Sequence, residues 1–328
     1  MEQLKNELAP WGAIWGASGV QGFFGEGYRF HNLFLKMLWR NFEGMTFVAK
    51  TATAEERKGN MPLKANGTTT VEFLPRCVYC TPMLWLKGAM LNAVGLSNKG
   101  INFLLKDGRW QEMKDPFMIS IMPVGDTPAK RLEEIKTMAR AIRTQLNYFQ
   151  APVALQLNIS CPNTGHNIHE LEKEVIGYMD AMGKIKLPTI VKINPLFPIG
   201  LAKQISEHLA CAGLSPSNTL GFGEASNDIP WKKLFGTNDP NQSPLKKRGF
   251  GAGGLSGKHL FPLEIDWIKR AREAGISCHI NCGSCFSKEN VCLAYKAGAN
   301  SISLGTVALH RPWRVPGIIR TAKQLFKK

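Results

Sequence analysis

Residues 155–167 read LQLNISCPNTGHN, an apolar run that breaks into a polar loop. Leu155, Leu157 and Ile159 indicate a buried strand, and Pro162 prevents this strand from continuing as a central ladder. The side chains expected at the C-terminal end of the strand are those of Asn158, Ser160, Cys161 and Asn163. Taken alone, the stretch also fits an ordinary strand end followed by a hydrophilic turn.

Length and composition are those of a globular protein. The chain has 328 residues, 44% hydrophobic and 20% charged, which is enough for one large α/β barrel or two modest domains. No run of about 18 apolar residues predicts a membrane span, and Met1–Pro10 does not resemble a secretory signal. The eight cysteines are scattered, which favours reduced thiols in a cytoplasmic protein over a disulfide framework.

The net charge of +16 raises the possibility of a nucleic-acid partner. However, the basic residues are spread along the chain, with short clusters only at 246–248 and 327–328. No recognisable nucleic-acid module accompanies them. The charge therefore favours a solvated basic surface or attraction of anionic small molecules, and we expect neither a nucleic acid nor a membrane as partner.

Apolar runs and helical spacing alternate about eight times without an evident linker. Strands are predicted at about 11–16, 45–49, 117–122, 155–159, 189–193, 214–220, 277–281 and 301–304. Helices are predicted at about 130–149, from about 170, at 201–212, 262–274 and 288–297, and at the basic C-terminus. This alternation predicts a (β/α)8 TIM barrel that forms a single domain over residues 1–328.

Two stretches interrupt the alternation. Residues of about 60–90 predict an insertion after the second strand, which residues 91–98 close. A second stretch, rich in Gly, Asn and Pro, predicts a long loop that ends at 253–257. The alternative fold, an open doubly wound sheet, lacks the early G-x-G-x-x-G motif that would support it.

The loops after the last two strands favour an anion. In TIM barrels the active site lies at the C-terminal ends of the strands, and phosphate often binds after strands seven and eight. Here those loops contain Gly283–Ser284 and Gly305–Thr306, small residues that expose backbone N–H groups. They predict a phosphorylated cofactor, most often flavin mononucleotide (FMN).

Amides and lysines dominate the other strand ends. Asparagine offers both a donor and an acceptor, so several of them can bracket a planar ring that has amide edges. A lysine within a strand needs an anion to offset its burial, either a ligand or a carboxylate across the barrel. The residues at these strand ends are Lys50, Asn92, Asn158, Cys161, Asn163, Lys192 and Asn218.

Six motifs, in order from about residue 12 to residue 312, resemble those of dihydroorotate dehydrogenases. The cysteine of NISCPN resembles class 1, in which a cysteine is the base, because class 2 has serine there. FGEGY and LNAVGL resemble the class 1 branch that works with a separate FAD and iron–sulfur subunit. The motifs are ASGVQGFFGEGY (17–28), KTATAEERKGNMP (50–62), LNAVGLSNKG (91–100), LNISCPN (157–163), GGLSG (253–257) and AGANSISLGT (297–306).

The resemblance implies FMN-dependent oxidation of dihydroorotate to orotate in pyrimidine biosynthesis. Cys161 would remove the proton from C5, and the hydride from C6 would pass to N5 of the flavin. Substrate would be held by Lys50, Asn92, Asn158, Asn163 and Asn218. FMN would be held by Ala17, Ser18, Lys50, Thr51, Asn158, Lys192, Thr219, Gly254, Gly283, Ser284, Gly305 and Thr306. A homodimer, the FAD and iron–sulfur subunit and a cytoplasmic location are further expectations.

Some features depart from the family pattern. Ser284 stands where the family usually has a second glycine, and the loop after Asn163 lacks the expected glycines, which leaves the electron acceptor open. The alternatives are an FMN enzyme for another dihydropyrimidine, such as a uracil-like one, and an enzyme similar to tRNA dihydrouridine synthases. Asn163 favours dihydroorotate, because uracil-reducing relatives have histidine after S-C-P. Metal is not expected, because the cysteine spacings match no ferredoxin pattern.

Overall fold

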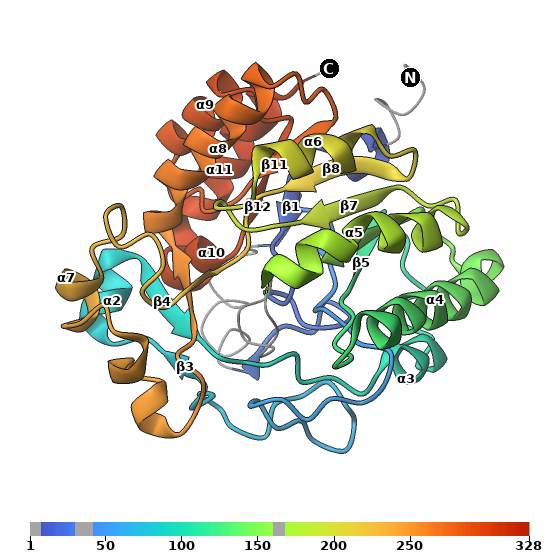
Figure 1. The fold of residues 1–328 in the computed structure, drawn as a ribbon, viewed down its shortest axis with the longest axis horizontal. Helices are drawn as coiled ribbons and strands as arrows, with labels where there is room; N and C mark the ends of the chain where they lie inside the picture. The colour runs from blue at the N-terminus through green and yellow to red at the C-terminus, as the bar shows by residue number, and fades with distance from the viewer. Residues whose placement is uncertain (1–7, 30–41, 160–167, 328) are drawn as a thin grey trace.

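Eight parallel strands form a barrel in the computed structural model (Figure 1). The structure describes residues 8–29, 42–159 and 168–327. The strands are paired in the order β1-β12-β11-β8-β7-β6-β5-β2. A parallel bridge between Trp15 and Thr46 joins the two ends of this sheet and closes the ring. The fold is therefore the predicted (β/α)8 barrel.

The described strands and helices of the barrel alternate along the chain. The strands are β1 Ile14–Gly16, β2 Phe47–Val48, β5 Phe117–Ile121, β6 Val153–Asn158, β7 Thr189–Lys192, β8 Cys211–Ser215, β11 His279–Cys282 and β12 Ser301–Leu304. The helices are α3 Ile101–Lys106, α4 Pro128–Gln145, α5 Ile168–Gly183, α6 Ile199–Glu207, α8 Phe261–Glu273, α9 Lys288–Lys296, α10 Thr306–His310 and α11 Val315–Leu325. In Figure 1, α8, α9 and α11 cover one side of the barrel, and α3 and α4 cover another.

The barrel interior is apolar at its N-terminal end. Trp15, Val48, Met118, Ala154, Ile190 and Ala212 point inward from six strands, and Leu8 and Trp11 pack against them. The Trp11 Nε1 donates a hydrogen bond to the Phe117 carbonyl at 2.8 Å, and the Trp15 ring stacks on His279 with centroids 5.1 Å apart. These contacts fill the bottom of the barrel, so a ligand has room only at the other end.

Side chains alternate along a strand, so the next residues that point inward lie further along each strand. Several of these residues are polar. Ser215 Oγ donates to Asn281 Oδ1 at 3.1 Å, and Asn281 Nδ2 donates to Ser301 Oγ at 2.8 Å. His279 Nε2 lies 2.7 Å from the same Ser301 hydroxyl. These buried groups satisfy one another across three neighbouring strands, and they form the floor beneath the strand ends.

A second sheet lies beside the barrel and was not predicted. It has the order β3-β4-β10-β9 and is antiparallel throughout. Figure 1 shows β3, β4, α2 and α7 together at the left of the view. The elements are β3 Val78–Tyr79, α2 Pro82–Lys87, β4 Ala89–Asn92, β9 Leu220–Gly221, α7 Trp231–Phe235 and β10 Gly254–Gly257.

One predicted loop is therefore wrong in part. Residues 253–257 do not only end a loop, because Gly254–Gly257 forms β10 and pairs with β4 in the insertion. Residues 91–98, expected to close the insertion, begin inside β4. A buried apolar cluster that includes Leu84, Leu91, Trp231 and Leu255 holds these segments together.

One predicted helix is too long. Residues 201–212 were expected to be helical, but α6 ends at Glu207 and β8 begins at Cys211 instead of 214. His208 turns the chain: it is extended, and its Nδ1 accepts a hydrogen bond from the Ala210 N–H at 3.1 Å. Leu209 is 81% exposed, so its apolar character did not mark a helix face.

Gly257→Ala tests the close contact between the end of β10 and the start of the antiparallel strand β4. Gly257 has φ +126°, and an added Cβ would lie 2.1 Å from the Gly88 carbonyl oxygen, which is backbone and cannot move aside. We expect the substitution to lower the free energy of unfolding by about 2–5 kcal/mol, because backbone strain and overpacking act together. Gly108→Ala is the control: φ is +92° with nothing within 4 Å, so only about 1–2 kcal/mol should be lost. Equal losses in urea unfolding would contradict this.

Candidate active site

A cavity of about 1150 Å³ opens at the C-terminal ends of the barrel strands. Its wall combines the strand ends with residues from the insertion and from β10. The structure brings most of the predicted site residues into this one wall. Those that line the cavity are Ala17, Ser18, Lys50, Thr51, Asn92, Asn158, Lys192, Asn218, Thr219, Gly283, Ser284, Gly305 and Thr306.

Three predicted residues are not among them. Gly254 does not line the cavity; it pairs with Asn92 and Gly221 inside the second sheet, while its neighbours Ser256 and Gly257 reach the wall. Cys161 and Asn163 lie outside the described residues. The roles assigned to all three stay predictions.

Asn158 and Asn218 form the polar centre of the wall. Asn158 ends β6 beside Lys192, its partner in the register of β7. Asn218 Nδ2 donates to Asn158 Oδ1 at 2.9 Å, and both side chains are buried. The backbone N–H of Asn218 donates to the Ile193 carbonyl at 2.9 Å, which holds the segment after β8 against the end of β7. The two amides are thereby fixed in orientation before any ligand arrives.

Ser18 and Thr51 connect the ends of β1 and β2. Ser18 Oγ donates to the Ala49 carbonyl at 2.8 Å and lies 3.1 Å from Thr51 Oγ1. Thr51 Oγ1 in turn lies 2.9 Å from Ser120 Oγ on β5. This chain of hydroxyls crosses three elements and positions small polar groups at the cavity wall.

Lys50 is the most unusual cation in the cavity. Its side chain is buried, its Nζ donates to the Ser97 carbonyl, and it lies 4.6 Å from the centroid of the Phe23 ring. Burial lowers the pKa of Lys50 to about 7, and the negative charges of ionised Cys77 and Glu26 would act in the opposite direction and raise it. The amine is therefore poised to change charge near neutral pH, and an anionic ligand would favour its charged form.

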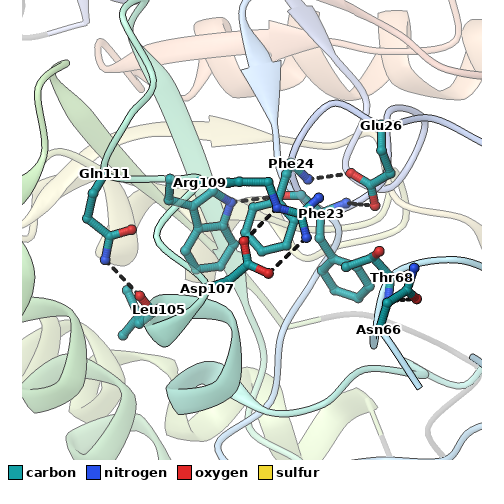
Figure 2. A network of polar contacts seen from close by, with 10 residues as sticks. Phe23, Phe24, Glu26, Asn66, Thr68, Leu105, Asp107, Arg109 and Gln111 are labelled. Carbon is teal, nitrogen blue, oxygen red and sulfur yellow. Dashed lines mark hydrogen bonds and ion pairs between the residues drawn. The ribbon is translucent and has the colours of Figure 1, made fainter. Parts of the chain in front are cut away.

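The loop after β1 places Phe23 beneath this lysine. Figure 2 shows Glu26 folding back onto its own loop, where its carboxylate accepts hydrogen bonds from the N–H groups of Phe23 and Phe24 at 3.0 and 2.7 Å. The Trp110 Nε1 donates to the Phe23 carbonyl at 2.7 Å. Arg109, paired with Asp107, covers the Phe24 ring at 4.0 Å (Figure 2). The loop is thus fixed from both sides.

The turns after β11 and β12 come very close to neighbouring residues. A Cβ added to Gly283 would lie 2.4 Å from the Ser217 Cβ, and one added to Gly305 would lie 2.9 Å from the Ala17 Cβ. Only glycine fits at either position without a shift of the neighbouring chain. Ser284 adopts φ +49°, a left-handed conformation in which glycine is normally favoured.

Sequence reasoning missed Glu264 behind this turn. Glu264 is 0% exposed and accepts a hydrogen bond from Ser284 Oγ at 2.6 Å. Burial raises its pKa to about 8, opposed by hydrogen bonds from Ser284, the Gly283 N–H and Cys282 and by the charge of Lys192. A signal was present, because Glu264 lies three residues after Phe261 and three before Trp267, on the buried face of α8.

The insertion supplies the opposite wall. Cys80 and His310 both line the cavity, with Cys80 Sγ 3.4 Å from His310 Nε2. Burial lowers the pKa of His310 to about 4 and raises that of Cys80 to about 11, so both are neutral at pH 7. Arg311 lies over the Trp85 ring at 4.2 Å, which ties the segment after α10 to the insertion.

The cavity wall is basic. Lys50, Arg76, Lys192 and Arg248 line it, and none of the described lining residues is an aspartate or glutamate. Such a surface raises the local concentration of anions. Together with the amides of Asn158 and Asn218, it suits a planar ligand that carries amide edges and negative charge.

A family model for dihydroorotate dehydrogenase matches residues 21–326, nearly the whole chain. The chain belongs to the dihydroorotate dehydrogenase family. It is therefore an oxidoreductase, as its motifs predicted.

Several family members are similar over most of their length. The catalytic subunit of dihydroorotate dehydrogenase B (NAD(+)) from Streptococcus pneumoniae is 27% identical over 335 residues, covering 99% of this chain and 90% of that protein. The corresponding subunit from Geobacillus kaustophilus is 29% identical and covers 96% and 85%. Dihydroorotate dehydrogenase A (fumarate) from Lactiplantibacillus plantarum is 27% identical and covers 83% and 78%.

Metal ligands and membrane-spanning helices were sought only among the residues that the structure describes. There, no three His, Cys, Asp or Glu side chains gather in a way that could hold a metal ion. Nor does that part contain a helix of sufficient length and apolarity to cross a bilayer.

Lys50→Met tests the buried amine. The pKa of Lys50 is about 7 in the folded protein, compared with the ordinary value of 10.5 expected in the unfolded chain. Between these values the unfolded chain binds a proton that the folded chain lacks, so stability rises with pH. The unfolding free energy of the unsubstituted protein, minus that of Lys50→Met, should therefore increase from pH 7 to 9 by up to about 1.4 kcal/mol per pH unit. Lys136→Met, exposed on α4, should show no such slope in urea unfolding. A flat difference for Lys50→Met would show that the amine stays charged.

Proposed function

We propose that this family member oxidises dihydroorotate to orotate with bound FMN, as a step of pyrimidine biosynthesis. The observation that supports this most is the convergence of thirteen predicted ligand-binding residues on one basic cavity at the C-terminal end of the barrel. The relatives named above carry the same activity in their names.

The described residues fit FMN. The cavity is large enough for a tricyclic ring with a second planar ring stacked on it, and its wall is basic. Gly283 and Gly305 permit close backbone approach at the two loops where TIM barrels often bind phosphate. Lys192, at the end of β7, would stabilise negative charge on the pyrimidine edge of the flavin. When bound, FMN would accept the hydride that leaves C6 of dihydroorotate.

The chain's own residues would orient the substrate and remove its proton. Asn158 and Asn218, already hydrogen-bonded to each other, would hold the pyrimidine ring together with Asn92 and Lys50 on the facing walls. Cys161 would remove the proton from C5 as general base. It follows Asn158 by only three residues in the sequence. Asn163, which follows Cys161 by two, would contribute a further amide.

The names of the relatives point to two different electron acceptors. Two of the relatives described above are named catalytic subunits of NAD(+)-linked enzymes, and one is named for fumarate. We propose the first arrangement, in which an FAD and iron–sulfur subunit would carry the electrons away. Homodimerisation and a cytoplasmic location stay predictions.

The purified protein should be yellow, and dihydroorotate should bleach it under anaerobic conditions. Cys161→Ala should keep the flavin but slow bleaching by at least about a hundredfold, the scale of losing a general base. Cys292→Ala on α9 is the control, because that thiol does not line the cavity, and it should bleach normally. Stopped-flow absorbance of the flavin measures both. Normal bleaching by Cys161→Ala would remove this residue from the mechanism.

The acceptor can be tested on the isolated chain with dihydroorotate as electron donor. If a partner subunit carries the electrons, NAD should support no turnover, while an artificial dye acceptor should. Rapid turnover with fumarate, at a rate comparable to that with the dye, would instead assign this chain to the fumarate-linked arrangement.

A further inference from the structure

The turn expected to bind phosphate contains an acid directly behind it. Glu264 lies in the first turn of α8 and is fully buried. Its Oε1 accepts the Ser284 hydroxyl at 2.6 Å, and its Oε2 lies 3.7 Å from Cys282 Sγ. A Cβ added to Gly283 would lie 3.3 Å from the same Oε2. The carboxyl therefore packs against the turn, and Glu264 itself does not line the cavity.

Ser284 and Glu264 form a matched pair. Ser284 takes a left-handed conformation that favours glycine, with φ +49°, and lines the cavity. A left-handed backbone conformation is unfavourable for a residue that carries a side chain. The hydrogen bond to Glu264 offsets this cost and ties the conformation of the turn to the carboxyl. A change in the charge of Glu264 would therefore alter the turn where the ligand would bind.

The groups around Glu264 leave it close to neutral. Lys192 on β7 attracts the ionised form, but among the described residues no cation forms an ion pair with Glu264. Cys282 stays protonated, because its hydrogen bond with Cys285 and burial raise the pKa of its thiol well above the ordinary value. Burial of Glu264 itself raises its pKa to about 8, so the carboxyl is mostly protonated at neutral pH and ionised above pH 8.

We propose that Glu264 couples the binding of the FMN phosphate to the uptake of a proton, so that the cofactor site loads at neutral pH and weakens in alkaline solution. The inference rests on the proposed function, because it takes FMN as the ligand. An ionised carboxylate behind the turn repels a phosphate dianion, whereas the protonated form does not. Phosphate therefore favours the protonated acid, and binding draws a proton from solution wherever Glu264 is ionised beforehand.

The direction of the pH dependence follows. Below about pH 8 the acid is already protonated, and its contribution to FMN affinity is constant. Above this value, affinity should fall by up to tenfold per pH unit, since a proton must be taken up for each FMN bound. Lys50 loses charge in the same range and weakens FMN binding independently. The contribution of Glu264 is therefore the difference between the unsubstituted protein and Glu264→Gln.

The experiment measures dissociation constants of FMN and riboflavin by flavin fluorescence on the full chain between pH 7 and 9.5. FMN binding should weaken by up to about 30-fold more in the unsubstituted protein than in Glu264→Gln over this range. Riboflavin lacks the phosphate, so its two profiles should coincide. Glu273→Gln removes an exposed carboxylate from the other end of the same helix and should behave like the unsubstituted protein.

A calorimetric measurement detects the proton itself. FMN titrations at pH 8.5 in two buffers of different ionisation enthalpy should show uptake of about three quarters of a proton more for the unsubstituted protein than for Glu264→Gln. Ser284→Gly provides an independent variant: without the hydroxyl donor, the pKa of Glu264 rises, and the loss of affinity should begin about one pH unit higher.

The outcomes separate this inference from the proposed function. Parallel FMN profiles for the unsubstituted protein and Glu264→Gln, with equal proton uptake, would overturn the coupling and leave FMN binding intact. Failure of both proteins to bind FMN at any pH, while both remain folded by circular dichroism, would overturn the coupling and the cofactor assignment together. Binding by Glu264→Gln alone would contradict the proposal that the unsubstituted protein loads FMN at neutral pH.

Discussion

Inside the barrel, every second side chain of a strand must point toward the axis, and no water is available there to satisfy it. In this chain the lower inward row is apolar and the row above it is polar. On β5 the change runs from Met118 to Ser120, and on β7 from Ile190 to Lys192. In this upper row the side chains of Ser215, Asn281 and Ser301 are buried and bind one another, whereas Gln156 Oε1 on β6 is buried with no hydrogen-bond partner among the described residues. The level along the barrel axis at which the inward side chains change from apolar to polar determines where the barrel is filled and where a ligand can enter.

The sequence predicts the barrel well because its strands are short apolar runs with clear ends. Phe117–Ile121 and Thr189–Lys192 lie within one residue of their predicted bounds, and each is buried along nearly its whole length. Residues directly after such runs must lie at the same end of a parallel barrel. For this reason Lys50, Lys192 and Asn218 could be placed together in advance, although they are far apart in the sequence.

The remainder depends on contacts that leave little trace in the sequence. Gly254 offers no side chain pattern, so neither β10 nor its pairing with β4 could be recognised. Glu264 is an acid on a helix face that is otherwise apolar, a signal that can be read only once the face itself is known to be buried. Cys80 and His310 meet only because the insertion folds back over the barrel. In each case a tertiary contact, not local propensity, decides the outcome.

The second sheet has a consequence for how the protein is made. One of its central strands comes from early in the chain and the other from late, and Asn92 can meet Gly254 only after most of the polypeptide has been synthesised. Closing so long a loop costs entropy that no local contact repays, so this sheet should be among the last parts to assemble. Barrel closure depends on a still longer loop, because Ile14 on β1 pairs with Ile302 on β12. A cofactor that needs both walls would therefore be captured only after both sheets have formed.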